Sequence, residues 1–511
     1  MPKLSTLNRS CEESRTQSEK SLELLRRQKM WTDTWVPDRF DVSLSLGLAP
    51  AEPVPAVSAG ARRAPGPGAQ AHAMAPVFQE ARAAGLECAN GGLCPSPWHT
   101  FQAQPVPDRG VAKHEGFVRQ NLTIFYKDRL GLYPYYEGDG KAFNGGLPQT
   151  ASLTEHLEKM PEGVNKYIRE VGAKGLAVID WEEWRPLWIR NWHTKDVYRN
   201  QSSLLIAKKN PSWSADMVAK VAQQEFELSA KKFMLETLRF AKSLRPNQLW
   251  GFYLFPDCYN HGYKTSLENY TGRCPDVETV RNDQLAWLWT ESTALFPSIY
   301  MASMLRSTSF GRQFVRNRVK EGMRLASVGE GVARPVFVYT RPTYANQLTP
   351  LTETDLVSTI GESVALGAAG VILWGDAAYA SSKATCRSLS NYLQGQLGQY
   401  LLNVSTAAEQ CSKALCASRG RCLRRRPDDD VYLHLSSHSQ RIVTEGGELR
   451  VSGQPDAAET DQLRENFRCQ CYSGYRGDTC ANAEPGMSTA SPSIQACLPT
   501  LLTLLLLILL H

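Results

Sequence analysis

Residues 175–192 read GLAVIDWEEWRPLWIRNW, and this stretch predicts both the fold and the site. The run GLAVIDW (175–181) is apolar almost throughout, which is typical of a strand buried on both faces of a parallel sheet. Asp180 ends the run, and Glu182 and Glu183 follow closely. Barrels of parallel strands carry their chemistry at the carboxyl ends of the strands, so these acids stand where a catalytic site is expected.

Similar apolar runs alternate with amphipathic segments between residues 113 and 408. Helices are predicted over 215–242 and over 351–366, where Thr352 and Thr354 are candidate caps. Repeated β-α units over about 290 residues favour a (β/α) barrel over a doubly wound sheet, and no GxGxxG or Walker motif follows a strand. The other runs are LTIFY (122–126), LWGFYLF (249–255), PSIY (297–300), VFVYT (336–340) and GVILWG (370–375).

The acids of the first stretch have a spacing that suits catalysis. Residues i and i+2 of a strand face the same side, so Asp180 and Glu182 are expected to point one way and Glu183 the other. Two carboxyl groups about 6–7 Å apart are coupled, so one keeps its proton while the other ionises. This arrangement suits cleavage of a glycosidic bond. The alternative is a pair of solvated acids, or a salt bridge to Arg185 or Arg190.

Composition excludes several classes of protein. The chain has 511 residues, 42% hydrophobic and 21% charged, which is enough for two or three domains. Its net charge, 57 − 51 = +6, is too small for a polybasic nucleic-acid binder. No apolar window of about 20 residues exists, which excludes a protein with several membrane spans.

Cysteines and sequons indicate an oxidising, extracytoplasmic environment. Of the 13 cysteines, many crowd into residues 411–480 without the CxxC or His spacing of metal sites. Four N-glycosylation sequons agree with this environment. They begin at Asn121, Asn200, Asn269 and Asn403.

The two ends of the chain differ from the middle. Residues 1–112 are expected to be largely disordered, because 50–75 are rich in Ala, Pro and Gly, and 1–30 lack the apolar core of a secretory signal. At the other end, 486–490 are small, 491–495 form a polar spacer and an apolar tail begins at Leu498. This layout over 483–511 predicts a GPI-attachment signal. A tail anchor or a sticky terminus is the alternative.

Four stretches resemble the vertebrate hyaluronidases, glycoside hydrolase family 56, and especially their GPI-anchored members. They are residues 175–192, LWGFYLFPDCYNH (249–261), RNDQLAWLWTESTALFPSIY (281–300) and LGAAGVILWGD (366–376). The resemblance covers about 113–482 and implies a distorted (β/α) barrel over 113–408 and an EGF-like module over 409–482. It also implies an endo-acting enzyme that hydrolyses β-1,4 N-acetylhexosaminidic bonds of hyaluronan and, more slowly, chondroitin.

The resemblance assigns roles to the site residues. Glu182 would be the proton donor, and Asp180 would orient the substrate's acetamido group, whose oxygen attacks C1 with retention. Since the substrate supplies the nucleophile and no ligand cluster is visible, no metal or organic cofactor is expected. Arg185, Arg190 and Arg318 would suit a polyanion, with ion pairing as the alternative. The implied substrate contacts are Tyr126, Tyr253, Tyr300, Arg318 and Trp374.

The resemblance also implies disulfides and shows one departure. Family members begin the barrel with an apolar strand and a cysteine that pairs with the one at Cys386. Nothing upstream of Lys113 resembles that strand, so an exposed sheet edge is expected. Cys94, or less favourably Cys88, would replace the partner of Cys386. The other implied pairs are Cys258–Cys274, Cys411–Cys422, Cys416–Cys469 and Cys471–Cys480.

Two functions therefore follow from the sequence. The first is a monomeric hyaluronidase on the outer face of the plasma membrane, held by a GPI anchor, with the lysosome as a second location. The second is a GPI-anchored cell-surface hyaluronan-binding or receptor protein with little turnover, suggested by the tail, the cysteine-rich module and the atypical N-terminal region.

Overall fold

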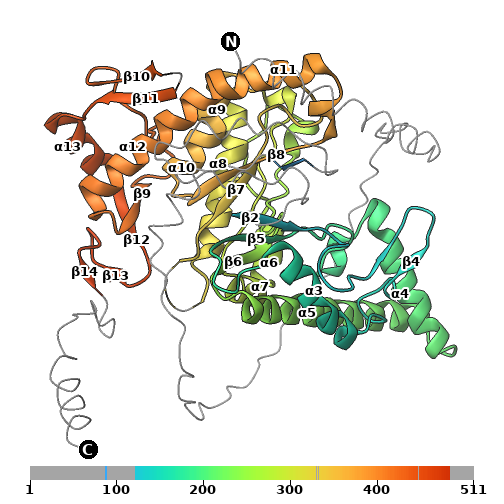
Figure 1. The fold of residues 1–511 in the computed structure, drawn as a ribbon. Helices are drawn as coiled ribbons and strands as arrows, with labels where there is room; N and C mark the ends of the chain where they lie inside the picture. Colours follow the sequence, from blue (N-terminus) through green and yellow to red (C-terminus); the bar gives the residue numbers. More distant parts are fainter. Residues whose placement is uncertain (1–86, 89–120, 330, 332, 447, 484–511) are drawn as a thin grey trace, which may run out of the picture. The chain divides into compact units, whose positions relative to one another are not determined.

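Two parallel three-stranded sheets frame the site (Figure 1). The computed structural model describes residues 87–88, 121–329, 331, 333–446 and 448–483, which all belong to one compact unit. One sheet has the order β2-β5-β6, and the other has the order β1-β8-β7. The strands are β1 (Glu87–Cys88), β2 (Leu122–Phe125), β5 (Gly175–Ile179), β6 (Gln248–Phe252), β7 (Phe337–Thr340) and β8 (Gly370–Gly375).

Residues 294–300 join the two sheets. They form isolated parallel bridges, with Phe296 beside Tyr253 of the first sheet and Ser298 beside Tyr339 of the second. The predicted strand PSIY is thus bridged rather than regular, because Pro297 has no N–H to donate to a ladder. The parallel strands thus follow one another in the order β2, β5, β6, 294–300, β7, β8 and β1, an order that a (β/α) barrel would also have. Pairing of β1 with β2, which would close it, is absent from the strand pairs of the described residues.

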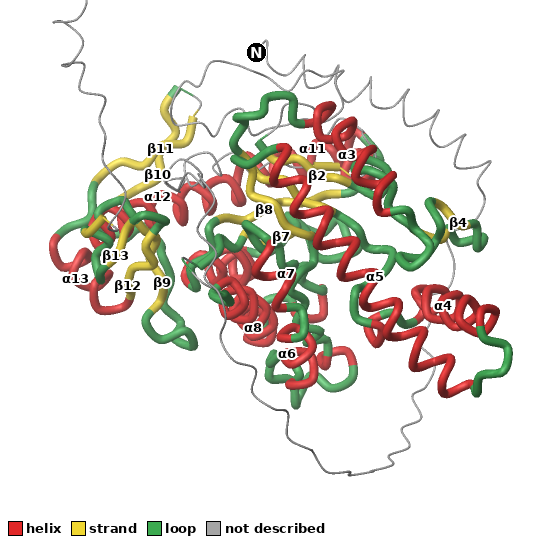
Figure 2. The backbone as a smooth tube through the Cα atoms, turned by 90° about the horizontal axis from the view of Figure 1, so that it is seen from below, coloured by secondary structure: helices red, strands yellow, loops and turns green. Residues whose placement is uncertain are grey.

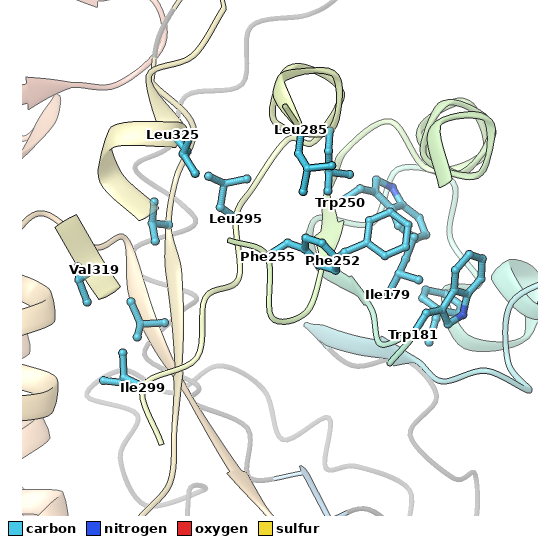
Figure 3. Close-up of a cluster of buried hydrophobic side chains, with 14 of the residues drawn as sticks. Ile179, Trp181, Trp250, Phe252, Phe255, Leu285, Leu295, Ile299, Val319 and Leu325 are labelled. Carbon is cyan, nitrogen blue, oxygen red and sulfur yellow. The ribbon is translucent and has the colours of Figure 1, made fainter. Parts of the chain in front are cut away.

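Both faces of the strands are buried, as their apolar runs predict. Along β5, Leu176 and Val178 face an inner cluster, whereas Ala177 and Ile179 face a larger outer one. Figure 3 shows this outer cluster, in which Ile179 and Trp250 lie together with side chains from the surrounding helices. Period-two alternation therefore sends every second side chain of β5 inward, toward the site.

Long helices lie around the strands (Figure 2). The predicted helix at 215–242 is α5 (Ala215–Leu244), which begins where Ser214 accepts a hydrogen bond from Met217 N and packs against α3. The other helices are α3 (Leu153–Tyr167), α4 (Asp196–Lys209), α6 (Asp276–Asp283), α7 (Ala286–Glu291), α8 (Ser309–Ala326), α11 (Lys383–Tyr392), α12 (Gly398–Cys416) and α13 (Ala457–Asn466).

The helical segment predicted at 351–366 is present, but it is not uniform. Thr352 caps it by accepting a hydrogen bond from Asp355 N, as expected. The chain then passes from α9 (Glu353–Leu356) through a π-helical turn, η6 (Val357–Gly361), into α10 (Glu362–Ala365). A periodic pattern cannot distinguish these turns from a regular α-helix.

The C-terminal region, residues 409–482, begins inside α12. The predicted boundary between residues 408 and 409 falls in the middle of this helix, so the first residues of the predicted module continue a helix that begins at Gly398. Beyond it, β9 (Gly420–Arg424) pairs antiparallel with β12 (Phe467–Cys471), with Cys422 opposite Cys469. The remaining strands are β3 (Tyr135–Tyr136), β4 (Ala142–Phe143), β10 (Gln440–Glu445), β11 (Glu448–Gly453), β13 (Tyr475–Arg476) and β14 (Asn482–Ala483).

The structure forms the four disulfides that the resemblance implied. They are Cys258–Cys274, Cys411–Cys422, Cys416–Cys469 and Cys471–Cys480. Cys386 is buried in α11, and the expected partner Cys94 lies outside the described residues. One short strand, β1, precedes Lys113. β1 pairs in parallel with β8, with Glu87 opposite Trp374.

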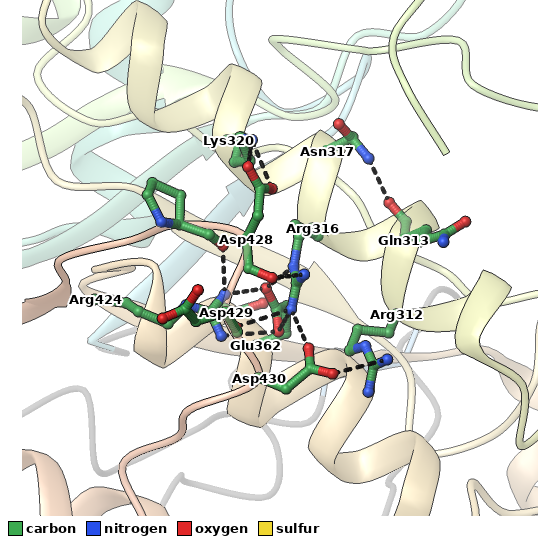
Figure 4. A network of polar contacts seen from close by, with 12 residues as sticks. Arg312, Gln313, Arg316, Asn317, Lys320, Glu362, Arg424, Asp428, Asp429 and Asp430 are labelled. Carbon is green, nitrogen blue, oxygen red and sulfur yellow. Dashed lines mark hydrogen bonds and ion pairs between the residues drawn. The ribbon is translucent and has the colours of Figure 1, made fainter. Parts of the chain in front are cut away.

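A buried ionic network attaches the C-terminal region to the helices (Figure 4). Glu362 of α10 is fully buried and lies between Arg316 of α8 and Arg424 of β9. The Arg316 Nε to Glu362 Oε1 distance is 2.7 Å. The same two guanidinium groups donate to carbonyl oxygens of the loop at 427–431. One carboxylate thus holds two cations that in turn hold this loop.

Among the described residues, no helix is both long and apolar enough to cross a membrane. The predicted GPI-attachment signal lies outside these residues, as does most of 1–112. Of the sequon asparagines, Asn121, Asn200 and Asn269 are exposed. Asn403 is half-buried, and its side chain accepts a hydrogen bond from Leu435 N.

His156 is expected to make the stability of the fold depend on pH. It is fully buried, accepts a hydrogen bond from Leu132 N at Nδ1 and contacts Thr237 Oγ1 through Nε2. Burial lowers the pKa of His156 to about 4. The unfolded chain therefore binds the proton more tightly, and stability should fall as the pH drops below about 6.5, by about 2–3 kcal/mol at pH 4.5. Urea unfolding at pH 7 and pH 4.5 measures this loss, which should shrink in His156→Gln but not in the exposed control His438→Gln. An equal loss in all three proteins would contradict the assignment.

Candidate active site

The paired acids lie at the carboxyl end of β5. Asp180 N donates a 2.9 Å hydrogen bond to Phe125 O, so the β2-β5 ladder extends to Asp180 and keeps it on the inner side with Val178. Glu182 lies beyond the ladder, with its side chain 52% exposed and Oε1 3.7 Å from Arg185 Nη2. Glu183 instead pairs with Lys127, at 3.3 Å. The main chain of Asp180 is thus held by the sheet, whereas the Glu182 side chain is exposed enough to meet a ligand.

Three aromatic rings form a row at the same end of the sheets. The Tyr253 and Tyr300 ring centres are 6.5 Å apart, and Tyr300 stacks on Trp374 at 6.0 Å. All three are partly buried and pack against the inner cluster. Tyr253 follows β6, Tyr300 ends the bridged segment and Trp374 lies near the end of β8, so parallel strands bring distant parts of the sequence to one edge.

Electrostatics connect the acids with this row. Burial raises the pKa of Tyr253, and the negative charges of Glu182 and Asp180 raise it further. Burial also raises the pKa of Tyr300, with contributions from Tyr253 and Asp180. Both hydroxyls therefore remain protonated, and Tyr253 lies within electrostatic range of both acids. The Tyr300 hydroxyl donates to Tyr253.

Tyr126 lies beside Asp180. The register that places Phe125 opposite Ile179 brings the next residue of each chain segment to the same level. Tyr126 is half-buried against the inner cluster, and the Arg129 guanidinium lies 4.7 Å from its ring centre. The predicted residues Tyr126, Asp180, Tyr253, Tyr300 and Trp374 are thus all at the inner, carboxyl edge of the sheets.

Arg318 is not placed as predicted. It is 5% exposed, and its guanidinium pairs with Asp257 at 3.0 Å and donates to Ser298 O and Asn260 Oδ1. With these partners it can support the loop after β6 and the bridged segment, but it offers little surface to a substrate. Arg190 is likewise buried in an ion pair with Glu278. Arg318 and Arg190 thus form buried ion pairs, which was the alternative to contact with a polyanion.

Arg341 is a residue that the sequence reasoning missed. Its guanidinium lies 5.1 Å from the Trp374 ring centre and 5.9 Å from that of Tyr300, and pairs with Asp376 at 2.6 Å. It therefore stabilises the aromatic row from its side. The signal was available, because Arg341 is two residues after Tyr339 and continues its inward-facing alternation.

None of these acids belongs to a candidate metal centre. In the part of the chain that the structure describes, the group of side chains with metal-ligand geometry is His438, Asp456 and Glu459. Its two carboxylates already accept the backbone N–H groups that begin α13. What the site offers chemically is a solvent-accessible carboxyl group, a second acid held by the sheet and aromatic faces, which is the equipment of a glycoside hydrolase.

Comparisons with known proteins give the family. The model of the glycoside hydrolase family 56 hyaluronidases matches residues 106–484. Hyaluronidase-2 of Bos taurus is 54% identical over 393 residues, covering 76% of this chain and 82% of its own, and that of Homo sapiens is 54% identical over 378 residues, covering 73% and 80%. The chain belongs to the hyaluronidase family, and it is a glycoside hydrolase.

A solved structure agrees with this assignment. Bee venom hyaluronidase in complex with a hyaluronic acid tetramer matches with a TM-score of 0.51 and 31% identity. The match covers 55% of this chain and 87% of the bee protein.

Proposed function

We propose that this protein hydrolyses the β-1,4 N-acetylhexosaminidic bonds of hyaluronan, and more slowly those of chondroitin, as an endo-acting, retaining enzyme. The observation that carries the proposal is the position of Asp180, the half-exposed Glu182 and the aromatic row together at the carboxyl ends of the parallel strands. The names of the relatives and the bound hyaluronic acid tetramer of the bee enzyme support the choice of substrate.

In the proposed mechanism Glu182 donates a proton to the leaving oxygen. The Glu182 side chain is half-exposed and can reach the leaving oxygen, whereas the main chain of Asp180 is fixed by the β2-β5 ladder. Asp180 orients the acetamido group of the bound sugar, whose carbonyl oxygen attacks C1, and stabilises the positive charge that develops there. No side chain becomes glycosylated, so the carboxyl groups need not have the spacing of a nucleophile and an acid.

The aromatic row provides the sugar subsite. Trp374 offers a face to the pyranose ring, and the Tyr253 and Tyr300 hydroxyls, which stay protonated, can hydrogen-bond the acetamido group. Arg341 keeps Trp374 in place through its guanidinium, which lies 5.1 Å from the Trp374 ring centre.

The activity is tested by following hyaluronan chain length. The full chain, expressed behind a secretory signal, is incubated with high-molecular-weight hyaluronan between pH 4 and 7. Rapid shortening with retained anomeric configuration supports the proposal. Retention of hyaluronan without any shortening would favour the receptor function instead.

We further propose that residues 409–482 form an EGF-like module whose role is to brace the catalytic region. The disulfide order Cys411–Cys422, Cys416–Cys469 and Cys471–Cys480 supports the first part. The second part is supported by the buried contact of Arg424 with Glu362, which adhesion would not require.

We also propose that the mature protein is GPI-anchored on the outer face of the plasma membrane. Cells that express the full chain behind a secretory signal should therefore release it into the medium when treated with phosphatidylinositol-specific phospholipase C. A chain that ends at residue 485 should be secreted without treatment and serves as the control. Full-length protein that stays on treated cells would refute the anchor and favour a tail that spans the bilayer.

A further inference from the structure

Two cations hold the main chain of the proposed proton donor. Arg185 Nη1 donates a 2.9 Å hydrogen bond to the carbonyl oxygen of Glu182, and Lys195 Nζ donates a second one to the same oxygen. The Glu182 carboxyl group takes no part in either bond, and its side chain stays 52% exposed. The backbone of this residue is therefore fixed while its acid remains available.

The segment that links these two cations is itself firmly attached. Asn191 is fully buried, accepts a 2.8 Å hydrogen bond from Arg185 N and donates one of 2.9 Å to Arg185 O. Arg190, which belongs to the same segment, forms its buried ion pair with Glu278 of α6. The turn ends at η3 (His193–Lys195), where His193 has a φ of 56°, a conformation that costs a residue with a β-carbon about 1–2 kcal/mol. Such strain persists only where the surrounding contacts over-determine the backbone.

Charged groups surround the Lys195 ammonium. Burial and the positive charge of Arg185 lower the pKa of Lys195 to about 8, while Glu182 and Glu183 oppose this shift. Lys195 therefore keeps its charge at acidic and neutral pH. A hydrogen bond from an ionised donor is stronger than a neutral one, so the charged lysine holds the carbonyl of Glu182 more firmly than a neutral amine would.

We propose that Lys195 is a positioning residue, which fixes the Glu182 proton donor relative to the bound sugar by binding its main-chain carbonyl. The inference rests on the proposed function, since it requires Glu182 to be the donor. A catalytic group displaced by about 1 Å loses about a hundredfold in rate. The loss of Lys195 should accordingly lower kcat and leave KM nearly unchanged.

The test compares Lys195→Met with Lys195→Arg and with Lys208→Met. Lys208 is an exposed lysine of the neighbouring helix α4 and is the matched control. Initial rates on hyaluronan should show kcat reduced about 10- to 100-fold in Lys195→Met at unchanged KM. Lys195→Arg should recover most of kcat, and Lys208→Met should equal the parent.

A second measurement covers the case in which Lys195→Met does not fold. The parent loses the lysine charge between pH 7 and 9 whereas arginine keeps it, so the kcat ratio of Lys195→Arg to the parent should rise over this range. A constant ratio, a raised KM at unchanged kcat or parental kinetics in Lys195→Met would each overturn the inference. A parent protein without any hydrolysis would instead refute the proposed function.

Discussion

Glu182→Gln is expected to lower kcat on hyaluronan by about 10²- to 10⁴-fold, because the amide cannot donate the proton that the leaving oxygen needs. Binding of hyaluronan should survive, since the amide retains the shape of the side chain and the aromatic row is unchanged. Single-turnover rates and hyaluronan affinity, measured on the same preparation, separate these two effects.

The neighbouring residue provides the control for this experiment. Glu183→Gln makes the same chemical change one position away, on a side chain that pairs with Lys127. It should keep most of the parental rate. If Glu183→Gln is the inactive variant and Glu182→Gln is not, the roles of the two acids have been assigned the wrong way round.

Glu362→Gln is expected to destabilise the protein by about 3–5 kcal/mol, the usual result of removing one partner from a buried ion pair. Arg424 would then lose its buried counter-charge and Arg316 would keep only Asp430, since Glu362 is 0% and Arg424 1% exposed at the side chain. Because these groups hold the loop at 427–431, we expect limited proteolysis of this loop to accelerate. Urea unfolding measures the stability change.

An exposed ion pair of the same region provides the comparison. Asp461 and Arg464 pair on the surface of α13, with side chains 68% and 57% exposed. Asp461→Asn should change the free energy of unfolding by less than about 1 kcal/mol. Equal effects of Glu362→Gln and Asp461→Asn would show that the buried network does not attach the C-terminal region.

The strands and the site acids were accessible from the sequence for a physical reason. Apolar runs buried on both faces leave few alternatives for a segment such as 175–179, and alternation along it then fixes which acid faces inward. The helix predicted over 215–242 begins where expected and extends to Leu244, because its apolar stripe continues to that residue. The resemblance to a family supplied the disulfide pairing, which spacing alone leaves open.

Other features depend on contacts between distant segments and could not be predicted in this way. Nothing in the residues around Arg318 shows that Asp257 and Ser298 will occupy its guanidinium, because these partners lie in other elements. The continuation of the second sheet by Glu87 and Cys88 was missed since two residues carry no periodic pattern. The π-helical turn at Val357–Gly361 and the turn that returns Lys195 to Glu182 are further examples.

The attachment of the C-terminal region has a consequence for protein engineering and for evolution. Any graft of residues 417–483 onto another hyaluronidase carries Arg424 with it but leaves Glu362 and Arg316 behind in the donor. A recipient without a carboxylate and an arginine at those places would receive an unmatched buried cation. Arg424 in the C-terminal region and its partners Glu362 and Arg316 are therefore constrained to change together, because a buried charge in one part needs its counter-charge in the other.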